Sequence, residues 1–483
     1  MANSPSSSAA SSPSIAAWSS RVGPPRILPA LLSLVVALSA SAQAPAAPSP
    51  PSGAAPSAEA ALSKESSEAA KRKDTISFGI DAEILELLRK LGAEKDGSCN
   101  AELAALLRKT KSPKLRTAVL ELFATLEWKG VEDEALSFVR DRDLLDPASV
   151  ASALSYLAAI RSKPALELAG PLIKEDDKKL LPALIRLLGR AGGGAEEELL
   201  LGWFESDAAT EELRQEAIRA LGEIGSVKAA ERLAALAKDP EKNRASRMSA
   251  CEALGKIKDP SSVQALVEAA NGEDPNVQAK AVEALASFES EAAEAALVEA
   301  LRYSNVKSRI AACKGIAARR IRSAEPFLRY KAANDPEKAV KTEAYRALAA
   351  LGGSSFGFLL ERMGDKKVEL QFRSLCFGLL MRKDASGSMK ELAAALAAEA
   401  EQKERSLYTA YAREIANAFD APDAAPLARV LLADKDPLMR VGAIEWARKS
   451  KAAGFKPELE RLAKEDPSEM IRKRAADTAE QLR

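Results

Sequence analysis

The sequence contains no histidine, which excludes His-containing catalytic triads, His-ligated metals and imidazole acid–base catalysis. Aromatic residues make up only 5% of the 483 residues while 47% are hydrophobic, so a buried core must consist mainly of Leu, Ala, Ile and Val. Neither sign of charge predominates, because the sequence has 70 Lys and Arg and 69 Asp and Glu, a formal net charge of +1. This balance argues against a whole-body electrostatic hold on nucleic acid or anionic lipid.

The start of the chain is predicted to be an export signal. The first 26 residues contain two Arg and no acid, an apolar run follows at 27–38 (ILPALLSLVVAL), and small residues come next. With Ala40-Ser41-Ala42 or Ala42-Gln43-Ala44 as the cleavage pattern, this order is typical of a secretory signal peptide over residues 1–44. The alternatives are retention of the run as an anchor, although a spanning helix needs ~20 apolar residues, and an organellar transit peptide. We expect an exported protein, periplasmic or secreted, with no membrane span after signal cleavage.

The residues after the signal divide into two parts. Residues 45–76 are rich in Pro, Ala and Ser and then polar, a composition that predicts a disordered linker. From residue 77 to 483 a two-helix unit repeats, most plainly in EAIRALGEIG from Glu216 and ACEALGKIKDP from Ala250. Alignment on the Leu or Ile of its Ala-Leu pair gives key residues 31 to 33 positions apart, namely Leu157, Leu188, Leu221, Leu254, Leu285, Ile316, Leu348 and Leu379. Such a period predicts a solenoid of about twelve units.

The positions around the key residues indicate how the units pack. Mostly Ala stands four positions before the key residue, Ala or Gly one position before it, and Ile, Phe or Leu three positions after it. These offsets share one helical face. Small residues on that face let neighbouring helices approach closely, and stacking joins the faces of single pairs into a continuous core.

Asp-Pro pairs and glycines are predicted to mark the helix ends. Asp is a good N-cap and Pro fits the first helical position. Seven such pairs separate apolar stretches: Asp146-Pro147, Asp239-Pro240, Asp259-Pro260, Asp274-Pro275, Asp335-Pro336, Asp436-Pro437 and Asp466-Pro467. Gly222, Gly225 and Gly255 stand where second helices are expected to close, a place typical of C-cap glycines.

The motif ALGEIG or EALGKI followed by a DP turn resembles the HEAT repeat, and its short period is similar to the phycobilisome-lyase type of HEAT-like repeat. The resemblance is clearest from Glu216 to Gly352, and it extends to the exported, periplasmic HEAT-repeat proteins of bacteria. It implies an all-α fold, a right-handed α-solenoid (a HEAT-like superhelix) of about twelve two-helix repeats. It also implies that the second helices line a concave, protein-binding surface. Because the motif encodes packing, it implies no activity.

The four cysteines are predicted to carry no shared chemistry. An even number in an exported protein suggests disulfides, but Cys251, Cys313 and Cys376 fall in one column, three positions before the key residue. Successive members are two repeats apart, roughly 20 Å by helix spacing, which is too far for a bridge. We expect buried free thiols there, whereas Cys99, in a polar turn, is the candidate for a reactive thiol. With no CxxC motif and no His, neither a metal site nor a cofactor is predicted.

Charge changes sign within the repeats. Residues 268–299 hold eight acids and one base, whereas residues 302–346 hold twelve bases and four acids. Two positions before the key residues the second helices carry, in order, Arg186, Arg219, Glu252, Glu283, Lys314 and Arg346. Neighbouring acidic and basic repeats that simply pair with each other would explain this pattern.

The other explanation is a docking groove for an acidic or amphipathic protein, with aromatic anchors and Arg contacts that set specificity. The candidate partner-binding residues are Lys314, Arg319, Arg320, Arg346, Tyr330, Tyr345, Glu252 and Glu283. The leading hypothesis is a non-catalytic protein-binding scaffold or adaptor in the cell envelope. One alternative is a bilin-lyase-like enzyme, which fits poorly with an export signal and lacks a visible acid–base group. The other is a nucleic-acid-binding solenoid, against which export and the neutral charge count.

Overall fold

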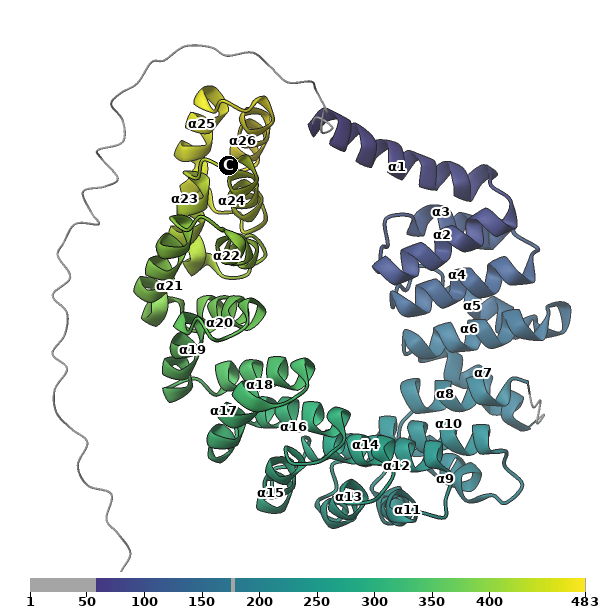
Figure 1. Ribbon diagram of the computed structural model, residues 1–483. Helices are drawn as coiled ribbons and strands as arrows, with labels where there is room; N and C mark the ends of the chain where they lie inside the picture. Colours follow the sequence, from purple (N-terminus) through teal and green to yellow (C-terminus); the bar gives the residue numbers. More distant parts are fainter. Residues whose placement is uncertain (1–57, 175–178, 483) are drawn as a thin grey trace, which may run out of the picture. The chain divides into compact units, whose positions relative to one another are not determined.

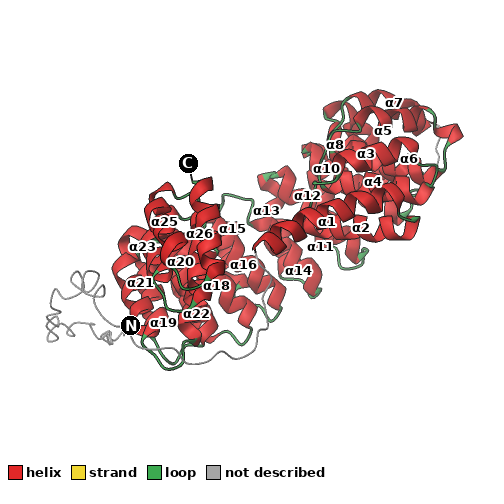
Figure 2. Ribbon diagram, turned by 90° about the horizontal axis from the view of Figure 1, so that it is seen from above, coloured by secondary structure: helices red, strands yellow, loops and turns green. Residues whose placement is uncertain are grey.

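The structure is a computed structural model that describes residues 58–174 and 179–482, and in these ranges helices are the only regular elements (Figures 1 and 2). The predicted all-α solenoid is confirmed. The predicted signal peptide, residues 1–44, lies outside the described residues, as does the beginning of the predicted linker.

The described helices form twelve successive pairs, α3–α4 to α25–α26, preceded by α1 (Ala58–Phe78) and α2 (Asp81–Glu94). The first helices of the pairs are α3 (Asn100–Lys109), α5 (Glu132–Arg140), α7 (Pro164–Lys174), α9 (Glu197–Glu205), α11 (Val227–Lys238), α13 (Val263–Ala270), α15 (Glu291–Ala300), α17 (Glu325–Asn334), α19 (Ser354–Gly364), α21 (Ala385–Ala400), α23 (Ala425–Leu432) and α25 (Lys456–Glu465). The second helices are α4 (Pro113–Thr125), α6 (Pro147–Ala159), α8 (Leu181–Ala191), α10 (Glu211–Ile224), α12 (Arg244–Ile257), α14 (Pro275–Leu285), α16 (Val306–Arg319), α18 (Lys338–Leu351), α20 (Leu370–Lys383), α22 (Ser406–Ala416), α24 (Pro437–Lys449) and α26 (Glu469–Gln481). Single 3₁₀ turns are η1 (Arg142–Leu144), η2 (Gly194–Glu196), η3 (Pro260–Ser262), η4 (Arg322–Ala324), η5 (Pro422–Ala424) and η6 (Ala453–Phe455).

The second helices form one continuous layer. Each even-numbered helix from α2 to α24 packs against the next even-numbered helix, and each first helix packs against its own partner (Figure 1). This is the arrangement expected of a solenoid, in which each repeat contacts its neighbours and their apolar faces join into one core.

Helix α1 occupies most of the segment that the sequence predicted to be a linker over 45–76. Its residue Ile76 is buried, and Arg72 donates hydrogen bonds to Asp96 at 2.5 Å and to Glu94 at 3.3 Å. The segment from Ala58 is rich in Ala, Glu and Lys and free of Gly and Pro, a composition with high helix propensity. The linker prediction therefore extended too far toward the C-terminus.

The key residues lie in the core, with one correction. All of them from Leu157 to Leu348 are buried on the even-numbered helices α6 to α18, whereas Leu379 of α20 is half-buried. Its neighbour Leu380 is fully buried, as are Cys376 four positions before it and Phe377 three positions before it. The register of this repeat is therefore one residue later than predicted, and Cys376 belongs to the small-residue column.

Two glycines that the sequence placed at C-caps have another role. Only Gly225 among the three caps its helix in the left-handed conformation, with φ of 73°. A Cβ on Gly222 of α10 would lie 2.7 Å from the Cα of Ala253 on α12, and a Cβ on Gly255 would lie 3.1 Å from the Cα of Ala284. Gly189 of α8 faces Ala220 in the same way, at 2.5 Å. These glycines therefore set how closely consecutive second helices approach.

The Asp-Pro pairs fall into two classes. Four of them act as predicted, because the Asp side chain accepts a hydrogen bond from a backbone N–H of the helical turn that follows, at Asp146, Asp259, Asp274 and Asp436. The other three, at Asp239, Asp335 and Asp466, come before the N-cap, and their second helices begin at Arg244, Lys338 and Glu469.

Two of these three Asp side chains are buried and tie consecutive repeats together. Arg309 of α16 donates from Nε and Nη2 to the carboxylate of Asp335 at 3.0 and 3.1 Å, and both side chains are at most 7% exposed. Its Nη1 also donates to the carbonyl oxygens of Tyr303 and Ser304. In α24, Arg440 repeats the arrangement with Asp466. Such bidentate, charge-assisted pairs fix the relative placement of neighbouring repeats.

Stability is expected to be flat between about pH 5 and 8 and to fall below about pH 4. The plateau follows because no histidine is present to titrate there. Burial acts to raise the pKa of Asp335, but the hydrogen bond from Arg309 and those from a backbone N–H and Lys331 outweigh it and hold that pKa below the ordinary value. A lowered folded-state pKa stabilises the fold above the unfolded-state pKa of about 3.9 and loses that effect as the pH falls.

Thermal unfolding followed by circular dichroism across this pH range measures the effect. Asp335→Asn serves as the matched control, because removing this carboxyl should reduce the decrease in the unfolding midpoint at acid pH. A midpoint that changes as much between pH 8 and 5 as between pH 5 and 3 would contradict the prediction.

Candidate partner-binding surface

The six charged residues two positions before the key residues share one exposed side of the second helices. They define what we call the second-helix row: Arg186 on α8, Arg219 on α10, Glu252 on α12, Glu283 on α14, Lys314 on α16 and Arg346 on α18. Arg186 is half-buried and the other five are exposed. The sequence prediction that charge changes sign along one face is thus realised between α14 and α16.

The acidic residues of the row are paired on their own helices. Lys256 donates to Glu252 at 2.8 Å and also reaches Glu223 of α10 at 3.0 Å. The hydrogen bond from Lys256 lowers the pKa of the Glu252 carboxyl. Lys280 donates to Glu283 at 2.6 Å. Both carboxylates keep roughly half of their side-chain surface open to a partner while they pair with these lysines.

The arginines at the α8–α10 end of the row share one acid. Arg186 and Arg219 donate to the same Oε1 atom of Glu216, at 2.7 and 3.0 Å, and Arg186 also bonds the hydroxyl of Ser155. The Glu216 residue is buried between them. At this end of the row both guanidinium groups are therefore paired with an acid of the chain itself.

Lys314 differs from the rest of the row. It is exposed on α16, a helix that carries Lys307, Arg309, Lys314 and Arg319 but no acid. Within the described residues no ion pair or hydrogen bond involves the Lys314 ammonium group. On the next second helix Arg346 is 54% exposed and pairs only with Glu343 of its own helix at 2.5 Å. The row thus presents cationic charge over α16 and α18.

The acidic and basic segments neutralise each other only in part. Two ion pairs among the described residues join 268–299 to 302–346: Arg302–Glu299 at 3.2 Å and Arg319–Glu294 at 2.9 Å. The remaining pairs of the basic segment are formed within it or with Glu369 of the next repeat. Mutual pairing therefore explains Arg319 but not Lys314.

Arg319 is a packing residue rather than a contact for a partner. Its side chain is 14% exposed and bonds Glu294 of α15, and its Nη1 atom is buried without a hydrogen-bond partner. The column three positions after the key residue holds Ile, Phe or Leu in most other repeats, of which Ile160, Phe288 and Leu351 are buried, and Arg319 lies on the same core-facing side. Its assignment as a binding residue is wrong for this reason.

Tyr345 was also predicted as a partner contact, and the structure places it in the core. It is 1% exposed and lies against Phe372 and Phe358, with ring centroids 5.6 and 6.4 Å apart. Burial raises the pKa of its phenol. The position three before the key residue is a core position in every repeat, so an aromatic side chain there fills volume instead of binding a partner.

Tyr330 and Arg320 lie away from the second-helix row. Tyr330 is 63% exposed on the first helix α17, where it lines an apolar pocket of about 340 Å³ with Leu301, Pro326 and Phe327. The guanidinium of Arg302 lies 5.3 Å from the centre of the Phe327 ring at the same pocket. Arg320 is the exposed C-cap of α16, with φ of 51°. The eight predicted residues therefore do not form one site: four belong to the row, and Tyr330 marks a separate pocket in the first-helix layer.

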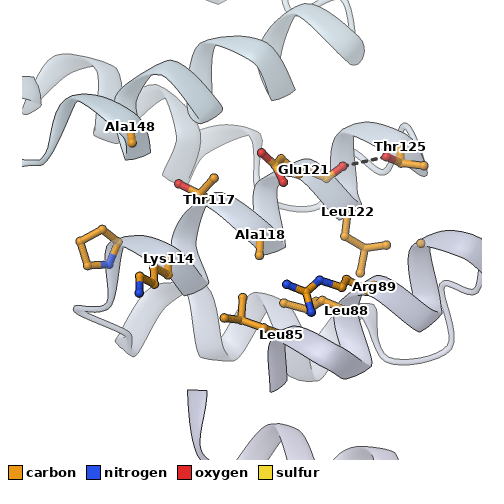
Figure 3. Close-up of a pocket in the computed structure, with 12 residues that line it drawn as sticks. Leu85, Leu88, Arg89, Lys114, Thr117, Ala118, Glu121, Leu122, Thr125 and Ala148 are labelled. Atoms are coloured by element: carbon orange, nitrogen blue, oxygen red, sulfur yellow. Dashed lines mark hydrogen bonds between the residues drawn. The ribbon is translucent and has the colours of Figure 1, made fainter. Parts of the chain in front are cut away.

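A groove that was not predicted from the sequence lies between α2, α4 and α6 (Figure 3). It measures about 560 Å³, and its apolar floor includes Leu85, Leu88 and Leu122. Arg89, Lys114 and Glu121 are charged residues of its lining. The aligned key residues begin at Leu157, so the repeat pattern did not indicate how α2, α4 and α6 pack.

Comparison with known proteins decides the family. The model of the family described as Spirochaete HEAT repeat protein matches residues 76–478. The chain belongs to this family. No curated protein matches it.

The solved structures that are similar to this HEAT-repeat chain match it at low identity and with TM-scores below 0.5. The complex of CpcE and CpcF of phycocyanin lyase from Nostoc sp. PCC7120 is 20% identical with a TM-score of 0.31, over 53% of this chain and 94% of that one. Importin beta is 12% identical with a TM-score of 0.46, over 87% and 69%. The karyopherin Kap121p bound to the extreme C-terminus of the phosphatase Cdc14p is 12% identical with a TM-score of 0.40, over 88% and 55%.

The cysteines of the HEAT repeats are free and buried, including Cys99. Burial raises the pKa of Cys251, Cys313 and Cys376 to about 12. Cys99 is only 2% exposed, so its polar neighbourhood in the sequence does not make it accessible, and the expectation of a reactive thiol there is wrong.

In the ranges 58–174 and 179–482, no group of three or more Cys, Asp or Glu is placed to hold a metal, and no helix has the length and apolarity to cross a membrane.

Proposed function

We propose that this HEAT-repeat chain is a non-catalytic protein-binding scaffold of the cell envelope that binds through the second-helix row. The observation that carries the proposal is Lys314, an exposed cation without an acidic partner on a helix without acids. Arg346 extends this charge to the next helix. A solvent-exposed cation of this kind is free to meet a carboxylate of another protein without first breaking an internal ion pair.

The partner that fits is an extended or helical segment whose charge also changes sign. Its acidic part would lie against Lys314 and Arg346, and its basic part would lie against Glu252 and Glu283, which are about half exposed. Such a charge pattern selects the partner and also fixes the direction in which its segment lies along the row, because the reversed segment would place like charges together. The envelope location rests on the predicted signal peptide at residues 1–44, and the absence of histidine supports a role in binding rather than acid–base catalysis.

Reversal of the two cations, Lys314→Glu with Arg346→Glu, is expected to weaken partner capture about tenfold or more while leaving the fold intact. The matched control reverses two exposed lysines that have no ion pair among the described residues and lie away from the row, Lys366→Glu with Lys390→Glu. Arg319 is left unchanged, since its pairing with Glu294 inside the repeat makes it unsuitable for reversal.

Capture is measured with a photo-reactive amino acid in place of Ala318, which is exposed on α16 one turn after Lys314, in intact cells, followed by identification of the crosslinked protein. The control carries the same amino acid at position 390. The expected result is a crosslink from position 318 to an exported protein with an acidic segment, which is lost when Lys314→Glu and Arg346→Glu are added. Equal crosslinking from both positions, or a product unaffected by the double reversal, rejects the row as the binding surface. A stable spectral change with bilin would instead indicate the lyase alternative.

A further inference from the structure

The most exposed large apolar side chains of the described residues lie at one kind of turn. Phe78, Leu144, Leu438 and Ile80 are 85%, 84%, 70% and 67% exposed. Leu144, between α5 and α6, and Leu438, at the start of α24, stand where the first helix of a pair leads into the second. Phe78, the last residue of α1, and Ile80, just before α2, stand at the corresponding turn from α1 to α2. Three of them therefore lie within the first three such turns. Single exposed apolar residues need no explanation, but repetition at one edge does.

The turn between these apolar points, from α3 to α4, is strongly basic. Residues 108–116 (RKTKSPKLR) contain five Lys and Arg and no acid. Arg108 pairs with Glu134, and Arg116 bonds the carbonyl oxygen of Thr110. The remaining three, Lys109, Lys111 and Lys114, are exposed and have no ion pair among the described residues.

Contacts between the helix starts hold the three turns side by side. The hydroxyl of Ser112 at the N-cap of α4 donates to Asp81, the first residue of α2, at 2.7 Å. Helices α2, α4 and α6 pack in succession (Figure 1). Because packed helices lie about 10 Å apart, the lysines stand between Ile80 on one side and Leu144 on the other. We call these six residues the turn-edge patch: Phe78, Ile80, Lys109, Lys111, Lys114 and Leu144.

Nearby acids lower the net charge of this edge but lie outside the basic turn. Asp81, Glu83 and Asp146 keep their negative charge and bond to the Ser112 hydroxyl, the backbone N–H of Ile80 and the start of α6. The turn from α3 to α4 itself holds five bases and no acid within residues 108–116. Asp141 and Asp143, beside Leu144, alternate with Arg140 and Arg142. The three lysines are thus a local excess of positive charge on a chain that is nearly neutral overall.

We propose that the turn-edge patch binds an anionic lipid bilayer surface. Apolar side chains that project from turns fit between lipid headgroups, and lysines between them meet lipid phosphates. A protein groove would instead need a concave apolar surface. Under the alternative in which the apolar run 27–38 is kept as an anchor instead of being cleaved, only residues 39–57 separate it from α1. The anchor would then raise the local concentration of the first turns at the same surface.

A polarity-sensitive label on single introduced cysteines tests the proposal in the full chain. Leu144→Cys places a nitrobenzoxadiazole label in the patch, and Val227→Cys places it at another exposed apolar site, 62% against 84% exposed, the first residue of α11. The four native cysteines are buried, so labelling is selective. Vesicles are of equal parts phosphatidylglycerol and phosphatidylcholine, or of phosphatidylcholine alone.

We expect a blue shift with several-fold brighter emission at position 144 on anionic vesicles, and no change at position 227. Replacing Lys109, Lys111 and Lys114 by Gln should weaken vesicle partitioning at least about tenfold. Co-sedimentation without a shift at position 144 means that the run 27–38 alone binds lipid, and it overturns the proposal. Equal emission shifts at both positions, or equal binding to neutral and anionic vesicles, would also overturn the proposal. An emission shift that grows with protein concentration in the absence of vesicles would overturn it too, because it would indicate contact between copies of the chain.

Discussion

Asp335→Ala is expected to lower the free energy of unfolding by about 3–5 kcal/mol, because it leaves the buried guanidinium of Arg309 without its counter-charge. The carboxylate is fully buried and accepts hydrogen bonds from Arg309, Lys331 and the backbone N–H of Glu337. Removing one partner of a buried, hydrogen-bonded pair costs far more than breaking a surface ion pair. Urea unfolding followed by circular dichroism measures the loss, and hydrogen exchange at α16 to α18 locates it.

The neighbouring acid provides the control for this prediction. Glu337 is exposed and makes no side-chain cap, so Glu337→Ala should change stability by no more than about 0.5 kcal/mol. Asp335→Asn keeps the shape while removing the charge, and it serves if the Ala variant fails to fold. The double variant Asp335→Ala with Arg309→Met should lose less free energy of unfolding than the sum of the two single variants, since each single change removes the same interaction. A loss below about 1 kcal/mol for Asp335→Ala would show that the pair does not hold the repeats together.

Gly→Ala substitutions on three consecutive second helices are expected to destabilise in the order Gly189, Gly222, Gly255. A Cβ would lie 2.5, 2.7 and 3.1 Å, respectively, from the Cα of the Ala on the next helix. Overpacking a close helix contact costs about 1–3 kcal/mol. Alanine gains up to about 1 kcal/mol of helix propensity over glycine. The net loss should therefore be largest at Gly189 and close to zero at Gly255.

Gly202 is the matched control for this series. It also lies within a helix, α9, but a Cβ there would meet no atom within 4 Å. Gly202→Ala should therefore stabilise the protein, by about 0.4–1 kcal/mol. Midpoints of urea unfolding for the four variants give the order directly. Equal effects at Gly189 and Gly202 would mean that second helices are not held at a fixed close distance.

The same packing explains which candidate residues could be assigned from the sequence. Position relative to the key residue separates exposed Lys314 and Arg346 from buried Tyr345, because helical periodicity fixes which side of a second helix faces the core. Composition alone misled at Tyr345 and Arg319, whose residue types are typical of binding sites but whose columns are core columns. Applied strictly, the register would have excluded both.

Other features depend on contacts between residues distant in the sequence. Asp335-Pro336 and Asp436-Pro437 look alike as dipeptides, yet Asp335 binds an arginine of the preceding repeat and Asp436 caps its own helix. Likewise, nothing local distinguishes Gly222, pressed against Ala253, from Gly225, which ends the same helix. The pockets beside Tyr330 and between α2 and α4 arise where large and small side chains of different repeats fail to fill the space between them.

The sequence by itself determined the helical repeat, its period, its buried columns and the change of charge sign along the second helices, because each depends on spacing within one repeat. Tertiary structure alone decided which charges remain free. The partner of Arg186 is an acid on the next second helix, that of Arg319 an acid on the preceding helix, and Lys314 has none among the described residues. Ion pairing depends on distances between neighbouring helices, and a periodic pattern sets the order of those helices but not the atoms that meet between them.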